Sequence, residues 1–196
     1  QILKMLTRLR QLCLEPRLVY DNIDQPSSKL KACMELIKTM QENKQKVLLF
    51  SSFTSALDLI AEECQKAGIT YYMLTGSTNK EERRELVSRF QKDNTTLFLI
   101  SLKAGGTGLN LTSAENVIHY DPWWNVSAQN QATDRAYRIG QKSNVQVFNL
   151  VMKDSVEEKI IEMQKRKKEL ADMFVENNSG GLSQMSKEDI LSLFTM

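Results

Sequence analysis

The sequence predicts an α/β fold, in which a mostly parallel β-sheet carries helices on both of its faces. Five short, largely apolar runs are the expected strands, at residues 46–51, 70–75, 96–101, 116–121 and 145–151. The first run is apolar almost throughout, which is typical of a strand covered on both faces. Segments with helical spacing of apolar residues separate most of these runs, and strands that alternate with such helices require crossover connections and a parallel sheet.

Length and composition agree with one ordinary domain. The chain has 196 residues, of which 41% are hydrophobic and 26% charged, the usual balance of a globular protein with a sizeable core. Its formal net charge of +2 provides no global basic field. Any contact with nucleic acid must therefore come from a local patch.

Cysteine usage and the absence of apolar spans bear on location. The three cysteines are odd in number and lack CxxC spacing, which argues against a disulfide framework or a zinc site. We find no signal peptide and no apolar run near the roughly twenty residues of a membrane span. These features predict a reducing, intracellular location. The chain begins at Gln1 inside an amphipathic pattern, so we expect a fragment of a longer protein.

A helix is predicted over residues 2–14, where Ile2, Leu6, Leu9 and Cys13 recur at helical spacing and Pro16 follows. Its simplest interpretation is a helix that packs through this stripe. A polar connector with turn-forming residues then covers residues 21–26.

Helix caps can be assigned for the central segments. Ser28 is the predicted cap of a helix over residues 28–40, and Thr54 that of a helix stopped by Gly68. Thr78 and Glu81 have the spacing of a capping box for a helix that runs to Phe90.

The stretch from Ser101 to Gln141 concentrates the unusual chemistry. Three of the eight glycines, Gly105, Gly106 and Gly108, directly follow a predicted strand, where the backbone approaches a partner closely or adopts positive φ. Downstream, Gln131, Arg135 and Arg138 are spaced i, i+4 and i+7, which places them on one face of a predicted helix.

Two interpretations of the arginine pair remain open. The arginines could be a solvated surface or an ion pair with Asp134, since most exposed ion pairs do little. Alternatively, because a glycine loop precedes them, they could form half of a nucleotide site. The active groups of such sheets gather beyond the carboxyl ends of the strands, where both motifs are expected.

Four segments resemble the motifs of a known family. Residues 47–54 (VLLFSSFT) resemble motif IV, 104–111 (AGGTGLNL) motif V and 131–141 (QATDRAYRIGQ) motif VI of the Swi/Snf family of DNA-translocating ATPases in helicase superfamily two. Residues 74–83 (LTGSTNKEER) resemble a further family block, so that the resemblance covers nearly the whole chain.

The resemblance implies a RecA-like C-terminal helicase lobe at residues 27–152. A helical segment and connector at 1–26 would precede it, and a brace-like helix, linker and short terminal helix at 153–196 would follow. Asp154 and Glu157 are the predicted caps of that long helix.

The resemblance also implies site residues. Arg135 and Arg138 would be arginine fingers, and the residues near the nucleotide would be Gly106, Gly108, Asn110 and Gln131. The residues facing the DNA backbone would be Arg83, Ser101, Lys103 and Trp124. The implied partners are double-stranded DNA, the N-terminal ATPase lobe of the same protein and an unidentified DNA-bound cargo. The expected location is the cytoplasm or nucleoid of a bacterium or the nucleus of a eukaryote.

The absence of a phosphate loop limits what this chain does alone. No glycine is followed by lysine, so the chain contains no GxxxxGK[ST] loop, and no DExH-type sequence follows a strand. ATP and Mg²⁺ are therefore expected only in the intact two-lobed enzyme, with none tightly bound to this fragment, and the fragment should not hydrolyse ATP. The alternative is a non-catalytic module of the same fold that binds DNA or a protein.

Three further side chains have both a structural and a functional interpretation. Trp123 is expected in the core, whereas Trp124 beside Asn125 could equally pack or contact DNA. His119, the only histidine, lies within a predicted strand without a nearby metal-ligand partner, which favours a structural role.

Overall fold

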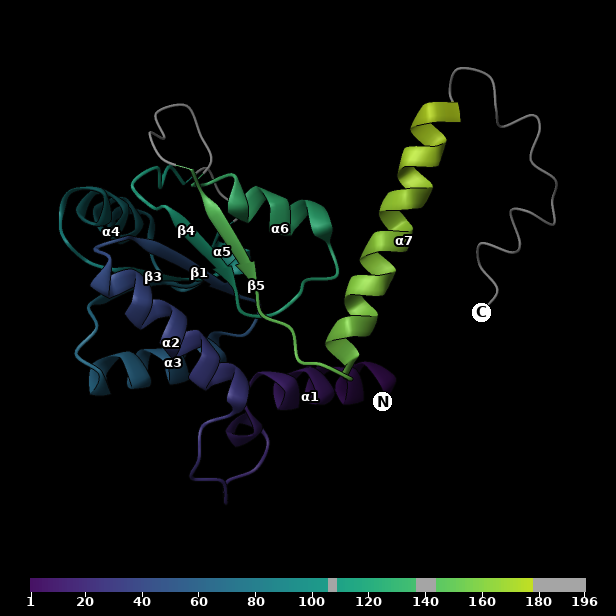
Figure 1. Ribbon diagram of the computed structural model, residues 1–196, viewed down its shortest axis with the longest axis horizontal. Helices are drawn as coiled ribbons and strands as arrows, with labels where there is room; N and C mark the ends of the chain where they lie inside the picture. The colour runs from purple at the N-terminus through teal and green to yellow at the C-terminus, as the bar shows by residue number, and fades with distance from the viewer. Residues whose placement is uncertain (106–108, 137–143, 178–196) are drawn as a thin grey trace. The chain divides into compact units, whose positions relative to one another are not determined.

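The computed structural model describes residues 1–105, 109–136 and 144–177. Its centre is a five-stranded sheet in the order β2-β3-β1-β4-β5, and all the pairings are parallel (Figure 1). The strands are β1 (Val47–Ser51), β2 (Tyr71–Leu74), β3 (Leu97–Ser101), β4 (Asn116–His119) and β5 (Gln146–Asn149). The predicted α/β class and all five predicted strands are confirmed.

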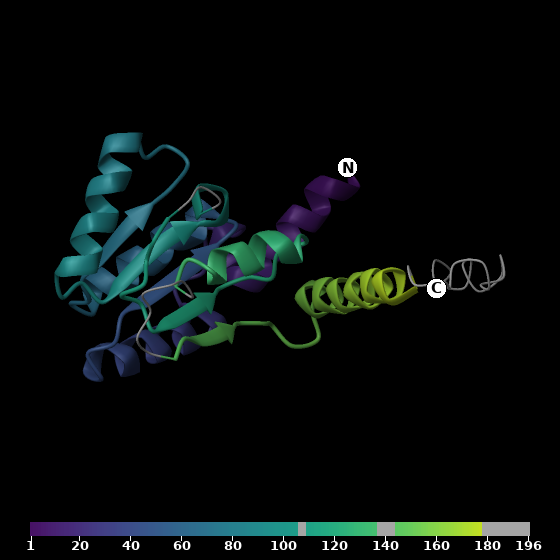
Figure 2. The same cartoon turned by 90° about the horizontal axis from the view of Figure 1, so that it is seen from above.

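Helices cover both faces of the sheet (Figure 1, Figure 2). Val47 and Leu49 of β1 point into a core shared with α2 (Ser28–Glu42) and α3 (Thr54–Lys66). Leu48 and Phe50 point to the other face, into a core shared with α4 (Lys80–Lys92) and α6 (Val126–Thr133). The near-continuous apolar character of β1 follows, because successive side chains enter opposite cores.

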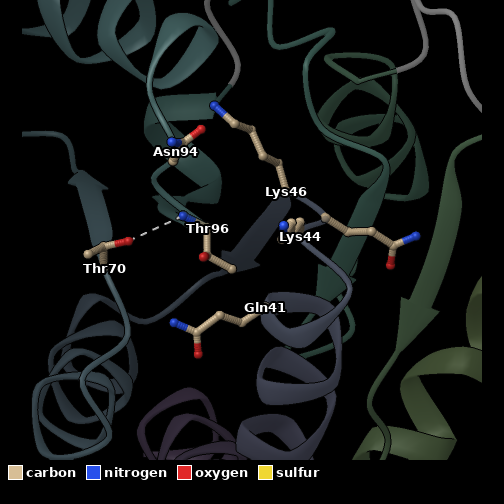
Figure 3. Close-up of a pocket in the computed structure, with 7 residues that line it drawn as sticks. Gln41, Lys44, Lys46, Thr70, Asn94 and Thr96 are labelled. Atoms are coloured by element: carbon tan, nitrogen blue, oxygen red, sulfur yellow. Dashed lines mark hydrogen bonds between the residues drawn. The ribbon is translucent and has the colours of Figure 1, made fainter.

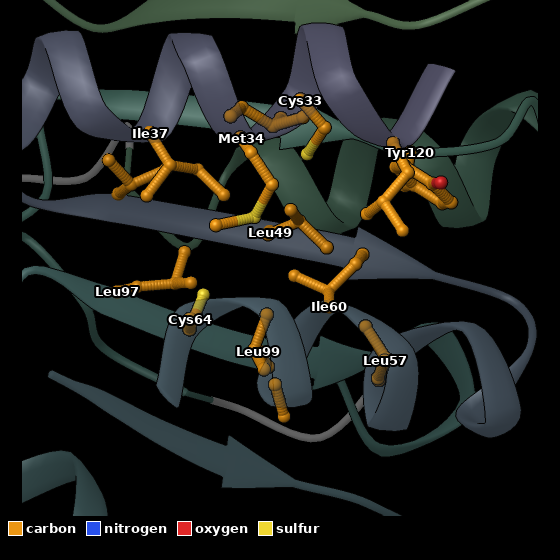
Figure 4. Packing of buried hydrophobic residues seen from close by; sticks show 14 of the residues in the cluster. Cys33, Met34, Ile37, Leu49, Leu57, Ile60, Cys64, Leu97, Leu99 and Tyr120 are labelled. Atoms are coloured by element: carbon orange, nitrogen blue, oxygen red, sulfur yellow. The ribbon is translucent and has the colours of Figure 1, made fainter. Parts of the chain in front are cut away.

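The first core is closely packed. Cys33 and Ile37 of α2 lie over Leu49, with Ile60 and Cys64 of α3 nearby (Figure 4), and all five side chains are fully buried. Burial raises the pKa of the Cys64 thiol to about 12 and that of Cys33 further. The cysteines are free thiols, as predicted. The buried pair is therefore part of the packing and not reactive.

Two predicted helix starts are shifted by one residue. Ser27, in the extended conformation, caps α2 in place of Ser28, because its Oγ accepts a hydrogen bond from Leu30 N at 3.1 Å. Asn79 caps α4 in place of Thr78, and its Oδ1 accepts from Glu82 N at 2.9 Å. Adjacent polar residues have the same cap chemistry, so the backbone conformation at each position decides between them.

Two other predicted caps are also wrong, whereas Gly68 is confirmed. Phe53 occupies the position before α3, so Thr54 is already helical. The last helix, α7 (Val156–Asn177), starts after Ser155, whose Oγ accepts from Glu157 N at 3.1 Å, and Asp154 lies one residue earlier with φ of 54°. Gly68 follows α3 with φ of 68°, a conformation that glycine adopts without a Cβ penalty.

The first helix, α1 (Ile2–Leu14), ends before Pro16 as predicted, and a 3₁₀ turn (Pro16–Leu18) follows it. The prediction that the apolar stripe is its packing face holds only in part, because Leu6 and Cys13 are half-buried but the other two members are exposed. Ile2 is 74% and Leu9 42% exposed, whereas Arg10 and Leu14 are buried. The helix is rotated because the buried partners of Arg10 lie at the edge of the sheet, as described below.

The chain separates into two compact units, residues 1–160 and 161–196. In the first unit, Lys29 of α2 lies 2.6 Å from Glu157 in the first turn of α7 and 5.4 Å from the Tyr120 ring, and the carboxylate of Glu157 also accepts from Met152 N. The domain boundaries at 26/27 and 152/153 remain predictions. The short α5 (Leu102–Gly105) follows β3 directly. No helix in the described part of the chain combines the length and the apolar character that crossing a membrane requires.

Candidate functional site

The carboxyl ends of the strands form the candidate site. A hollow of about 670 Å³ lies there between the segments that follow β1, β2 and β3. The residues that line it are Ser52, Thr54, Asp58, Met73, Thr75, Gly76, Ser77, Ser101 and Lys103. The parallel sheet thus brings together loops that are about 25 residues apart in sequence, as expected for this class of fold.

Three of the predicted DNA-facing residues meet at α5. Ser101 is 4% exposed, and its Oγ accepts a hydrogen bond from Ala104 N at 3.4 Å. Arg83 of α4 donates to Ala104 O, while Lys103 is exposed at the hollow. Ser101 and Arg83 therefore support the α5 backbone, and Lys103 is the exposed cation of this group.

The helix placement of Arg135 is a wrong prediction. The helix α6 ends at Thr133, and Arg135 lies in the turn that follows. Asp134 N still donates to Asn130 O, but Arg135 N donates to Ala132 O, an i to i−3 bond that tightens the last turn. Arg135 is 6% exposed and Gln131 is exposed, so the two do not share a helical face.

The backbone nevertheless joins the glycine-rich segment to the arginine turn. Leu111 N donates to Arg135 O at 3.0 Å. Gln91 of α4, which the sequence did not single out, holds the same segment: its Nε2 donates to Asn110 O at 2.7 Å and its Oε1 accepts from Ser113 N at 3.1 Å. Of the other predicted nucleotide-site residues, Gly106, Gly108 and Arg138 lie outside the described residues.

The two tryptophans follow β4 at the same edge of the sheet. Trp123 packs against the core that α4 and α6 share, but it remains half-buried, and its N donates to Gln129 Oε1 at 3.3 Å. Trp124 is half-buried, and its contact with DNA remains a prediction.

His119 is structural, as predicted. It is 2% exposed, stacks on Phe50 with ring centroids 5.7 Å apart, and its Nε2 lies 2.9 Å from Thr133 Oγ1. Within the described ranges, no group of three or more His, Cys, Asp or Glu side chains could hold a metal ion. Burial lowers the pKa of His119 to about 4, so the ring is neutral at pH 7.

This buried neutral ring predicts a pH dependence of stability. The folded pKa of His119 is about 4, below an unfolded value of about 6.5, so the unfolded state binds the proton more tightly. The stabilisation is complete above pH 6.5 and falls as the pH drops toward 4, by up to about 1.4 kcal/mol per pH unit. Urea unfolding of the wild type and His119→Gln between pH 7 and 4.5 measures it, because this is the only histidine. Parallel curves for the two proteins would contradict the prediction.

A buried polar cluster at this edge was missed by the sequence reasoning. Asp121, which follows β4, is 1% exposed and binds Ser51, Ser52 and Arg10. No local pattern marks it, because Arg10 lies 111 positions earlier in the chain.

A second hollow, of about 490 Å³, lies at the amino ends of the strands (Figure 3). It is lined by Gln41, Lys44, Gln45, Lys46, Thr70, Asn94 and Thr96, none of which is a predicted site residue. Lys46 donates to Phe90 O, and burial lowers its pKa. The residues that line this hollow are therefore separate from those that line the hollow at the carboxyl edge.

Three features define a RecA-like helicase lobe. They are the parallel sheet, the motif-like segments that follow its strands, and the backbone bond between the glycine-rich segment and the arginine turn. The family model for the helicase conserved C-terminal domain matches residues 28–140, and the chain belongs to this family. It corresponds to the C-terminal helicase lobe of the SWI/SNF type of ATP-dependent helicase.

Individual relatives support this assignment. The solved SWI2/SNF2 ATPase C-terminal domain of Sulfolobus solfataricus is 30% identical with a TM-score of 0.70, over 85% of this chain and 69% of that one. The putative ATP-dependent helicase/translocase YwqA of Bacillus subtilis is 39% identical over 100% of this chain and 22% of its own length. An uncharacterized ATP-dependent helicase of Mycoplasma pneumoniae is 38% identical over 98% of this chain and 19% of its own length. The chain thus spans about a fifth of the length of these two relatives.

Proposed function

We propose that this chain is the second ATPase lobe of a translocase that moves along duplex DNA and remodels bound protein. The observation that carries the proposal is the polar hollow at the carboxyl edge of the sheet, which the motif-like segments after β1, β2 and β3 line together. In such sheets, ligands bind at this edge.

In the proposed division of labour, the first lobe holds ATP and Mg²⁺. This chain has no phosphate loop, and its described residues offer no cluster of metal ligands, so it does not fit that task. Arg135 and Arg138 would supply guanidinium groups to the phosphoryl group, whose charge spreads over its equatorial oxygens during transfer. Asn110 and Gln131, both exposed, would lie toward the nucleotide, together with Gly106 and Gly108. The chain alone is therefore expected to show no ATPase activity.

The proposed DNA face comprises Lys103, Ser101, Arg83 and Trp124. Lys103 is the exposed cation at a hollow that several hydroxyl side chains and the carboxylate of Asp58 also line. Lysine and hydroxyl donors can contact phosphates without reading the base sequence. The alternative function, a non-catalytic binding module, uses the same edge. A parent gene that encodes no GxxxxGK[ST] loop and no DExH lobe upstream would favour the alternative.

Binding of this chain to duplex DNA tests the proposed face. We expect weak, sequence-indifferent binding that salt strongly reduces, since phosphate contacts release counterions. Lys103→Gln should weaken binding to two unrelated duplexes equally and reduce the slope of log K against log salt by about 1. Fluorescence anisotropy with labelled duplexes at several KCl concentrations measures both effects.

Lys38→Gln is the matched control, because Lys38 is an exposed lysine of α2, away from the hollow. An equal effect of Lys38→Gln and Lys103→Gln would rule out a DNA contact specific to Lys103. Sequence-selective binding that persists at high salt would count against the whole proposed face.

A further inference from the structure

Arg10 is the one buried residue among the three basic residues of α1, with 9% of its surface exposed. Its Nη2 lies 2.8 Å from Ser52 Oγ, 3.0 Å from Asp121 Oδ2 and 3.4 Å from Pro122 O. Its guanidinium also lies over two aromatic rings, 4.9 Å from the centre of Phe53 and 5.6 Å from that of Trp123. One side chain therefore contacts both the loop after β1 and the loop after β4.

Asp121 completes the connection between the two loops. Its Oδ1 accepts hydrogen bonds from Ser51 Oγ at 2.7 Å and from Ser52 N at 3.0 Å. Its Oδ2 accepts from Arg10 and from Ser52 Oγ. Both carboxylate oxygens are satisfied by groups from β1, its following loop and α1, so the carboxylate and the guanidinium lock the two strand ends together.

We infer that Arg10 is a positioning residue for the two loops that follow β1 and β4, which together are called the rim of the lobe below. Through Ser52, Asp121 and the Trp123 ring, it holds the loop of residues 52–53 and the loop of residues 121–124 in one arrangement. The inference rests on the proposed DNA-facing role of Trp124 for its functional consequence. It deepens that proposal, because it assigns control of the rim to a helix that precedes the sheet in sequence.

The chemistry of the contacts calls for arginine at this position. A planar guanidinium can donate in its plane to the serine and aspartate while its face lies on the Phe53 and Trp123 rings. The lysine ammonium is a point charge without a flat face, so it cannot both donate hydrogen bonds to the serine and aspartate and lie flat against the two rings. Arg10→Lys should therefore not restore the rim.

The test compares Arg10→Met with the matched control Arg8→Met. Both variants lose one positive charge from α1, but Arg8 is exposed and Arg10 is buried. The chain contains two tryptophans, Trp123 and Trp124, so acrylamide quenching of selectively excited tryptophan fluorescence reports on this loop alone. We expect Arg10→Met and Arg10→Lys to raise the quenching constant about twofold, and Arg8→Met to leave it unchanged. A quenching constant for Arg10→Met equal to that of the wild type overturns the inference.

A double-mutant cycle on DNA affinity tests the functional consequence. If Arg10 acts through the rim, Arg10→Met should weaken binding about tenfold, and Arg10→Met/Trp124→Ala should bind no more weakly than the weaker single variant. Losses that multiply in the double variant would overturn the coupling. If Trp124→Ala alone leaves binding unchanged, the DNA role of Trp124 fails, while the quenching result still decides whether Arg10 positions the loop.

Ser52→Ala is a milder variant that keeps the inference testable if Arg10→Met does not fold. It removes only the hydroxyl that bridges Arg10 and Asp121. We expect quenching to rise in the same direction as for Arg10→Met, by a smaller factor. No change in either the quenching constant or DNA affinity for Ser52→Ala would contradict a rim held by this network.

Discussion

Arg135→Ala in the complete two-lobed enzyme is expected to lower kcat at saturating DNA at least about a hundredfold. An interaction made only in the transition state appears in kcat, and arginine fingers contribute about 10³ to 10⁵ in rate where they act. The DNA concentration for half-maximal stimulation should stay nearly unchanged. ATPase rates measured against DNA concentration separate these two quantities, and the same loss is expected for Arg138→Ala.

Two further variants sharpen this experiment. Arg135→Lys should not rescue kcat, since the ammonium keeps the charge but loses the planar fork. Arg89→Ala is the matched control, because Arg89 is an exposed arginine near the end of α4, with its guanidinium over the Tyr72 ring. It should leave kcat intact. An unchanged saturating rate for Arg135→Ala, with a raised DNA requirement, would instead assign Arg135 to the DNA face.

The burial of Arg135 adds a requirement. Arg135 is 6% exposed in this lobe, so its guanidinium has to become accessible when the first lobe closes against it. Urea unfolding of Arg135→Ala should accompany the kinetics, because a loss of kcat with unaltered stability is what separates a transition-state role from a structural one.

Glu157→Ala is expected to lower the free energy of unfolding of the first unit by about 3–5 kcal/mol. Lys29 is 6% exposed in the wild type, and the substitution removes the carboxylate that lies 2.6 Å from its ammonium. It also removes the acceptor of Met152 N. An uncompensated buried charge is costly, whereas removal of both ions is often nearly neutral. Lys29→Met/Glu157→Leu should therefore recover most of the loss.

Urea denaturation of the 196-residue chain measures these differences. Glu158→Ala is the matched control, because Glu158 is the next residue in the first turn of α7 and its carboxylate accepts a hydrogen bond from Asp154 N at 2.9 Å. It should cost about 1 kcal/mol or less. A loss for Glu157→Ala no larger than that for Glu158→Ala would show that the buried pair contributes little.

The sequence by itself determined the strands and the edge of the sheet at which the loops after them meet. Residues 46–51 are apolar almost throughout, so as a strand they have to be covered on both faces. This property can be read from the local sequence alone. Alternation with helices made the sheet parallel, and a parallel sheet places the loops after its strands at one edge. The convergence of Ser52, Thr75 and Ser101 on one hollow was therefore predictable.

Only the tertiary structure decided the order of the strands, the caps and the end of α6. Ser27 and Ser28 offer the same hydroxyl, and the backbone conformation selects Ser27. Arg135 has the spacing of a helical residue in the sequence, but α6 ends at Thr133. The carbonyl of Arg135 instead accepts a hydrogen bond from Leu111 N. Such a competing partner lies 24 residues away and leaves no trace in local periodicity.

The orientation of α1 shows the same limit most clearly. Its apolar spacing predicted that Ile2 and Leu9 would pack, yet both are exposed, and Arg10 is buried against Asp121, which lies 111 residues later in the chain. Periodicity reports which face of an isolated helix avoids water. The rotation that the folded chain adopts depends instead on where a guanidinium finds its carboxylate and aromatic partners, and those are assembled only when β1 and β4 pair.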